Sequence, residues 1–98
     1  QPLIVRQLAS NDAEIRRCAV HALGRIGTPT AMLHIVHAAR DSDRGVRAMV
    51  VRVLAHACEA PEALNDERVI EELDRLSVDD DDAIARTARG ILDRCGRG

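Results

Sequence analysis

The stretch NDAEIRRCAVHALGRIGTPTA, residues 11–31, predicts one helix, a sharp stop and the start of a second helix. Asn11 and Asp12 are suited to the N-cap of the first helix. Apolar residues then recur with the helical period; they are Ile15, Cys18, Ala19, Ala22, Leu23 and Ile26. Gly27 is placed to end this helix in a left-handed conformation, and Pro29 suits the first turn of the next helix.

The same pattern recurs twice further along the chain. Asp43, Val46, Val50 and Leu54 lie 31 positions after Asp12, Ile15, Ala19 and Leu23. The segment DDAIARTARGILDRC, residues 81–95, repeats the spacing again. The amphipathic segments ERVIEELDRLS and PLIVRQLA add one helix in front of the third copy and one in front of the first.

A recurrence of about 30–40 residues built from helix pairs is typical of a helical solenoid. We therefore predict an all-α, right-handed α-solenoid with six helices in three pairs. The predicted repeats cover residues 1–27, 28–58 and 59–96 of a single domain, 1–98.

The amino-acid composition supports this fold and disfavours nucleic-acid binding. The 98 residues contain no aromatic side chain, so the core must consist of small aliphatic residues, which suit close-packed helices. The formal net charge is −2, and all 14 basic residues are Arg. A global basic field that would attract nucleic acid is therefore lacking. The three widely spaced Cys form no disulfide or zinc pattern, which predicts a reducing, cytoplasmic setting. The sequence contains no 18-residue apolar run, so no membrane span is expected.

The segment DAEIRRCAVHALGRIG, residues 12–27, resembles the short bacterial and archaeal form of the HEAT-like repeat, which also occurs in phycobilin-lyase-type proteins. The second copy resembles it less fully, and the third keeps mainly the periodicity. The resemblance implies that Asp12 with Arg16, and Asp43 with Arg47, have a structural role in the turn inside each helix pair. Gly27 and Pro29 are also structural, because they end one helix and begin the next.

Arg and His occupy the positions on the second helix of each pair that do not face the core. Within the first two copies they are four residues apart, so they share one helix face. Stacking of the pairs would bring them together as a basic strip on the concave surface. The basic strip consists of Arg17, His21, Arg25, Arg52, His56, Arg86 and Arg94.

Acidic residues gather elsewhere, in residues 71–74 and 79–82. This segregation favours an anionic partner for the basic strip. The alternative is an ordinary solvated helix face with no partner.

No catalytic, cofactor or metal site is predicted. His34 and His37 lie three residues apart, but a metal site needs a third ligand, and the sequence offers none. The acidic run at 79–82 lacks the alternating spacing and the glycine of a calcium loop. Cys58 and His56 point apart on a helix, which argues against a nucleophile pair. Iron-dependent hydroxylases of the HEAT-like fold use His-Glu dipeptides, and no His precedes Glu here.

The sequence thus predicts a non-catalytic protein-interaction or scaffold module that binds an acidic or phosphorylated protein segment on the basic strip. One alternative is a nucleic-acid-binding domain that uses the same arginines, which the absence of Lys and aromatic residues disfavours. Another is an accessory or lyase-type subunit of a HEAT-like enzyme. The apolar first helix, PLIVRQLA, predicts either preceding repeats or self-association through this end.

Overall fold

The computed structural model describes residues 3–57 and 67–96. These residues form helices and contain no strand. The six α-helices are α1 (Leu3–Gln7), α2 (Ala13–Ile26), α3 (Pro29–His37), α4 (Arg44–Ala57), α5 (Glu67–Leu76) and α6 (Asp82–Ile91). A 3₁₀ turn, η1 (Ala38–Arg40), extends α3, and a π-helical turn, η3 (Leu92–Gly96), extends α6.

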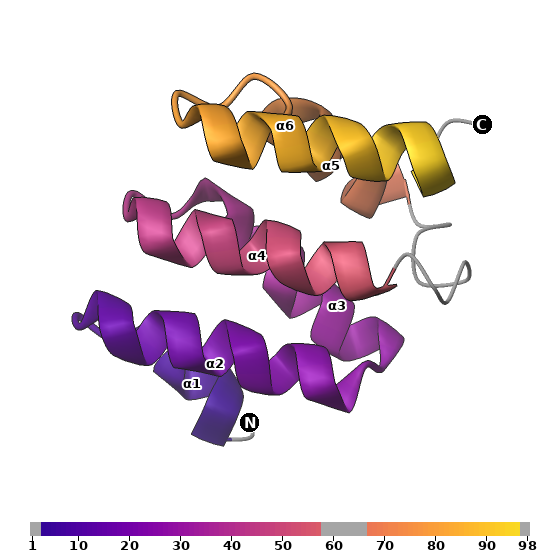
Figure 1. The fold of residues 1–98 in the computed structure, drawn as a ribbon. Helices are drawn as coiled ribbons and strands as arrows, with labels where there is room; N and C mark the ends of the chain where they lie inside the picture. The colour runs from indigo at the N-terminus through magenta and orange to yellow at the C-terminus, as the bar shows by residue number, and fades with distance from the viewer. Residues whose placement is uncertain (1–2, 58–66, 97–98) are drawn as a thin grey trace.

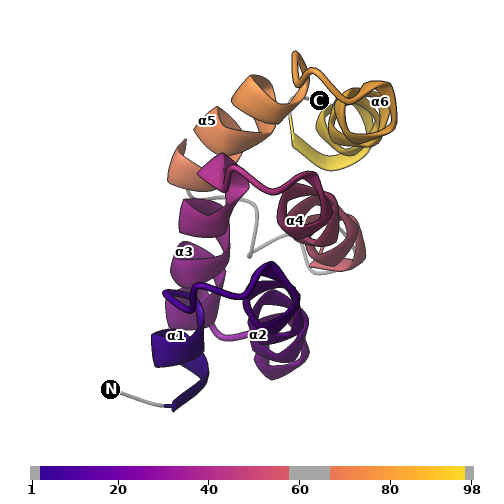
Figure 2. The same ribbon diagram turned by 90° about the vertical axis from the view of Figure 1, so that its left-hand side faces the viewer.

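The helices form two layers that run the length of the molecule. The helices α2, α4 and α6 lie side by side in one layer, and α1, α3 and α5 form the other (Figures 1 and 2). Each pair joins one helix of each layer through a short turn, and the three turns lie along the same edge (Figure 1). The predicted all-α solenoid of stacked helix pairs is confirmed.

Local signals in the opening stretch set the bounds of α2. The Asp12 side chain accepts a hydrogen bond from the Glu14 N–H at 2.9 Å and caps the helix. Gly27 ends it in the left-handed conformation, with φ of 71°, and donates its N–H to the Leu23 carbonyl at 3.1 Å. The Thr28 hydroxyl then accepts from the N–H of Ala31, which starts α3.

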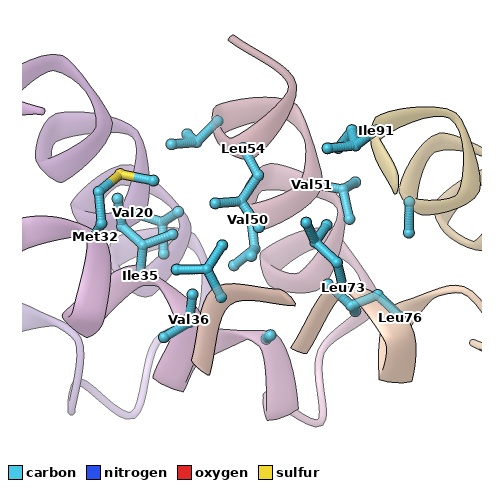
Figure 3. Packing of buried hydrophobic residues seen from close by; sticks show 14 of the residues in the cluster. Val20, Met32, Ile35, Val36, Val50, Val51, Leu54, Leu73, Leu76 and Ile91 are labelled. Atoms are coloured by element: carbon cyan, nitrogen blue, oxygen red, sulfur yellow. The ribbon is translucent and has the colours of Figure 1, made fainter. Parts of the chain in front are cut away.

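The core lies between the two layers and is continuous across the three pairs. Figure 3 shows Val50 and Leu54 of α4 in its centre, with Ile35 on one side and Leu73 and Ile91 on the other. All five side chains are fully buried. Because each pair has too little apolar surface to form a core alone, α4 depends on both of its neighbours.

The apolar stripe of α2 is only partly buried. Ala19 and Leu23 are in the core, whereas Ile15 and Ile26 are 41% and 52% exposed and Cys18 is exposed. The stripe includes the side of α2 that faces away from α4. Cys18, one of the apolar positions of the sequence pattern, is therefore not part of the core, and within the described residues no helix precedes α2 in its layer. Self-association through this end stays a prediction.

Candidate functional site

Polar side chains gather along the two edges of the α2, α4 and α6 layer. At the edge where these helices begin, Arg16 binds Asp41 in the turn of the next pair, with Nε–Oδ2 at 2.8 Å and Nη2–Oδ1 at 3.0 Å. Arg47 binds Asp79 in the same way, at 2.8 Å and 3.3 Å. We call these two contacts the junction pairs. Each is a bidentate guanidinium–carboxylate pair that joins one repeat to the following one.

The junction pairs correct the partners expected from the resemblance. Asp12 and Asp43 do not hold Arg16 and Arg47; both cap their own helices, and Asp43 accepts the N–H of Val46 at 3.0 Å. The arginines do secure the turns, since Arg16 also donates to the Ser10 carbonyl at 2.8 Å. Their carboxylate partners come from the neighbouring pair because the start of each helix lies beside the next turn.

Asp41 and Asp79 are the residues that sequence reasoning missed. Each precedes the N-cap position by two residues and accepts the N–H of that residue, Asp43 at 2.8 Å and Asp81 at 2.9 Å. Ser10 takes this place before Asp12, where its hydroxyl accepts the Asp12 N–H at 3.1 Å. In all three copies a polar residue lies two positions before the N-cap residue, and this repeated spacing is the sequence signal that could have identified Asp41 and Asp79.

The junction pairs perturb the titration of their carboxylates. Partial burial raises the pKa of Asp41, but the hydrogen bonds from Arg16 and from the Asp43 N–H outweigh it, so the pKa lies below its ordinary value. The pKa of Asp79 is lowered as well: burial raises it, and the Asp81 N–H and the Arg47 guanidinium together lower it further. Both groups are therefore held as carboxylates in the folded protein.

The basic strip lies on the exposed surface of α2, α4 and η3–α6. Six of its members are exposed, and Arg17 is half-buried. Two arginines near the helix starts are paired on their own helix. Arg17 binds Glu14, and Arg86 binds Asp82 at 3.0 Å. Arg94 donates weakly to the carbonyl of Gly90, at 3.4 Å.

The other four strip residues form a distinct set, which we call the unpaired group. They make no hydrogen bond or ion pair within residues 3–57 and 67–96 and are His21, Arg25, Arg52 and His56. All four lie in the second halves of α2 and α4, and these two half-helices contain no acidic residue. Cations near helix C-termini also complement the helix dipole, a contribution of about 0.3–1 kcal/mol at most exposed sites.

A hollow of about 410 Å³ opens between the last turns of α2 and α4. Three members of the unpaired group line it: His21, Arg25 and His56. The remaining lining is apolar or without a side chain: Gly24, Gly27, Met32, Val53 and Ala57. Basic residues and an apolar floor are thus adjacent at one place on the basic strip.

The other candidate groups do not assemble into a site within the described residues. No cluster of three or more His, Cys, Asp or Glu side chains in that part of the chain could hold a metal ion. In the acidic run at 79–82, Asp79 forms a junction pair with Arg47, and Asp81 caps the start of α6. Cys58 and the side chain of Cys95 lie outside the described residues. Across the described helices, none has the length and apolar character needed to span a membrane.

The comparison with protein families agrees with this architecture. The chain matches the family model for HEAT repeats over residues 1–91. No curated protein matches it.

Proposed function

Because the chain belongs to the HEAT repeat family, we propose that it is a non-catalytic interaction module that binds an acidic protein segment along the basic strip. The observation that supports this most is the unpaired group. The chain has 16 acidic and 14 basic residues, yet some exposed arginines have no carboxylate partner within the described residues. Arg25 and Arg52 are two of these on adjacent helices, so their guanidinium donors are available to a partner.

The distribution of acids sharpens the proposal. At the helix starts, Glu14 and Asp82 already neutralise two strip arginines. An acidic segment would therefore gain most by lying across the second halves of α2 and α4, where it meets positive charge without meeting a carboxylate. A protein segment fits better than a nucleic acid, because the strip has no Phe, Tyr or Trp on which a base could stack.

The test is fluorescence anisotropy at low and at physiological salt with three labelled probes: an oligo-glutamate peptide, a single-stranded DNA and a mixed-sequence duplex. We expect the peptide to bind in a salt-dependent manner and more tightly than either nucleic acid. Tighter binding of a nucleic acid would contradict the proposed partner class, and no binding of any probe at low salt would contradict the strip itself.

A matched pair of variants locates the binding. Arg52 and Arg6 are both exposed and both lack an ion pair within the described residues, but Arg6 lies on α1 in the other layer. Arg52→Ala should weaken peptide binding about three- to fivefold at low salt, whereas Arg6→Ala should leave it within error. Equal effects of the two variants would mean that the peptide responds only to net charge.

A further inference from the structure

We infer that the hollow between α2 and α4 is a side-chain pocket, which takes an aliphatic side chain of the acidic segment while the adjacent basic residues bind the flanking carboxylates. This inference rests on the proposed function and adds a specificity to it. A purely electrostatic strip would accept any acidic sequence. An apolar pocket within the strip would select acidic sequences that carry an aliphatic residue at the matching place.

Two glycines, Gly24 and Gly27, line the pocket at the end of α2. Gly24 faces Val53 of the adjacent helix so closely that an added Cβ would lie 2.7 Å and 2.8 Å from the two methyl carbons of Val53. Gly27, with its left-handed backbone, ends α2 beside it without a side chain. Gly24 thus lets α2 pack closely on Val53 in the floor, and at Gly27 an added Cβ would meet only the Gly24 carbonyl oxygen, at 3.8 Å, so the end of α2 leaves the hollow open.

The floor of the pocket is apolar and firmly held. Met32 is 3% exposed and Val53 is 8% exposed, and both belong to the main core. Ala57, the last residue of α4, is half-buried at the rim and packs against that core. An aliphatic side chain placed here would extend the core and remove apolar surface from water, which is favourable by about 25 cal/mol per Å².

The side chains at the rim of the pocket are basic, so the pocket favours an occupant with acidic residues beside its apolar side chain. His21 and Arg25 project from α2 and His56 from α4, so basic side chains approach the pocket from both helices. None of the three makes an ion pair within the described part of the chain. A segment with an aliphatic residue between acidic residues matches this arrangement, whereas a wholly apolar ligand would leave the charges unused.

Two labelled peptides of equal length and charge test the inference: an acidic peptide with a central leucine, and the same peptide with serine in its place. We expect the leucine peptide to bind about tenfold more tightly to the wild-type chain, because only leucine can bury apolar surface in the pocket. Equal affinities would overturn the pocket while leaving the proposed function intact. Failure of both peptides to bind would overturn both.

A filled pocket should abolish this preference. Ala57→Leu places a larger side chain at the rim, and Ala48→Leu makes the same change on α4 at a half-buried alanine that does not line the hollow. We expect Ala57→Leu to bind the two peptides equally and Ala48→Leu to keep the tenfold preference. A preference that persists in Ala57→Leu would contradict the inference.

Methyl NMR of the wild-type chain makes the test independent of any substitution. The chain has two methionines, and Met32 lines the hollow whereas Met49 does not. The leucine peptide should shift the Met32 methyl signal and leave that of Met49 in place, and the serine peptide should shift neither. An unchanged Met32 signal at saturating leucine peptide would place the binding elsewhere.

Discussion

The two halves of the helices α2 and α4 use the same side chain for opposite purposes. In the first halves, arginine meets acid: Arg16 and Arg47 form the junction pairs, and Arg17 binds Glu14. In the second halves, Arg25 and Arg52 meet no acid within the described residues. The junction arginine Arg47 has a side chain that is 18% exposed, whereas Arg52 lies in solvent. Arg16 and Arg47 join neighbouring repeats, whereas Arg25 and Arg52 are available to a partner.

The largest expected effect concerns a junction pair. Asp79→Ala leaves the guanidinium of Arg47 without its carboxylate and removes the acceptor of the Asp81 N–H, so we expect a loss of about 1–3 kcal/mol in the free energy of unfolding. For a chain of this length, each kcal/mol corresponds to about 4–8 °C in Tm. Thermal and urea unfolding followed by circular dichroism would measure the change.

The neighbouring Asp80 provides the control. It is exposed and makes no hydrogen bond or ion pair within the described residues. Asp80→Ala removes the same charge and should change the stability by less than about 0.5 kcal/mol. If the two variants were equally stable, the junction pair would contribute nothing that an ordinary surface charge does not.

The second prediction concerns the close contact between the second halves of α2 and α4, where Gly24 faces Val53. Gly24→Ala should destabilise the fold by about 1–2 kcal/mol, because the stiff, buried side chain of Val53 cannot move aside from the new Cβ. In a Val53→Ala background the same change should cost much less, and a double-mutant cycle would measure this coupling.

Gly90 is the matched glycine for this prediction. It is also in a helix of the same layer, but a Cβ there would meet nothing within 4 Å. Gly90→Ala should therefore stabilise the chain by up to about 1 kcal/mol, through helix propensity alone. Equal signs for Gly24→Ala and Gly90→Ala would contradict the account of this contact.

The third prediction is a dependence of stability on pH that the junction pairs cause. Their carboxylates have folded-state pKa values below the ordinary 3.8. Such a group contributes its stability above the unfolded-state pKa and loses it as the pH falls through the folded-state pKa. The stability advantage of the wild type over Asp79→Ala should thus be constant above about pH 5 and shrink as the pH falls below about 4. An advantage that grew toward acid pH would contradict the sign of the shift.

The sequence predicts the fold well because the fold follows from local signals. The caps at Asp12 and Thr28, the stop at Gly27 and the periodic apolar residues each act within a few positions, and all agree with the stacked helix pairs. The exposure of Ile15 and Cys18 was harder to predict. It depends on which helix lies beside α2, and a helical period shows only that one face is apolar.

The basic strip could be predicted only as a set of residues. Spacing by four places Arg17, His21 and Arg25 on one face, but it does not show which of them already has a partner. Glu14 lies close enough in sequence to foresee its pair with Arg17. The junction pairs join residues 25 and 32 positions apart, so they required the stacking register of the repeats. The hollow likewise depends on packing between two helices.

The most direct measurement compares two double variants of equal charge. Arg25→Ala with Arg52→Ala removes two arginines of the unpaired group, and Arg17→Ala with Arg86→Ala removes two that are paired on their own helices. Affinity for the acidic leucine peptide would be measured by anisotropy at two salt concentrations, after circular dichroism has shown that both variants are folded.

We expect the Arg25/Arg52 variant to lose at least about tenfold in affinity and most of its salt dependence, and the Arg17/Arg86 variant to lose less than about threefold in affinity. Equal losses in the two variants, or a larger loss from the paired arginines, would contradict the claim that arginines already paired within the chain contribute less to partner binding than the unpaired ones.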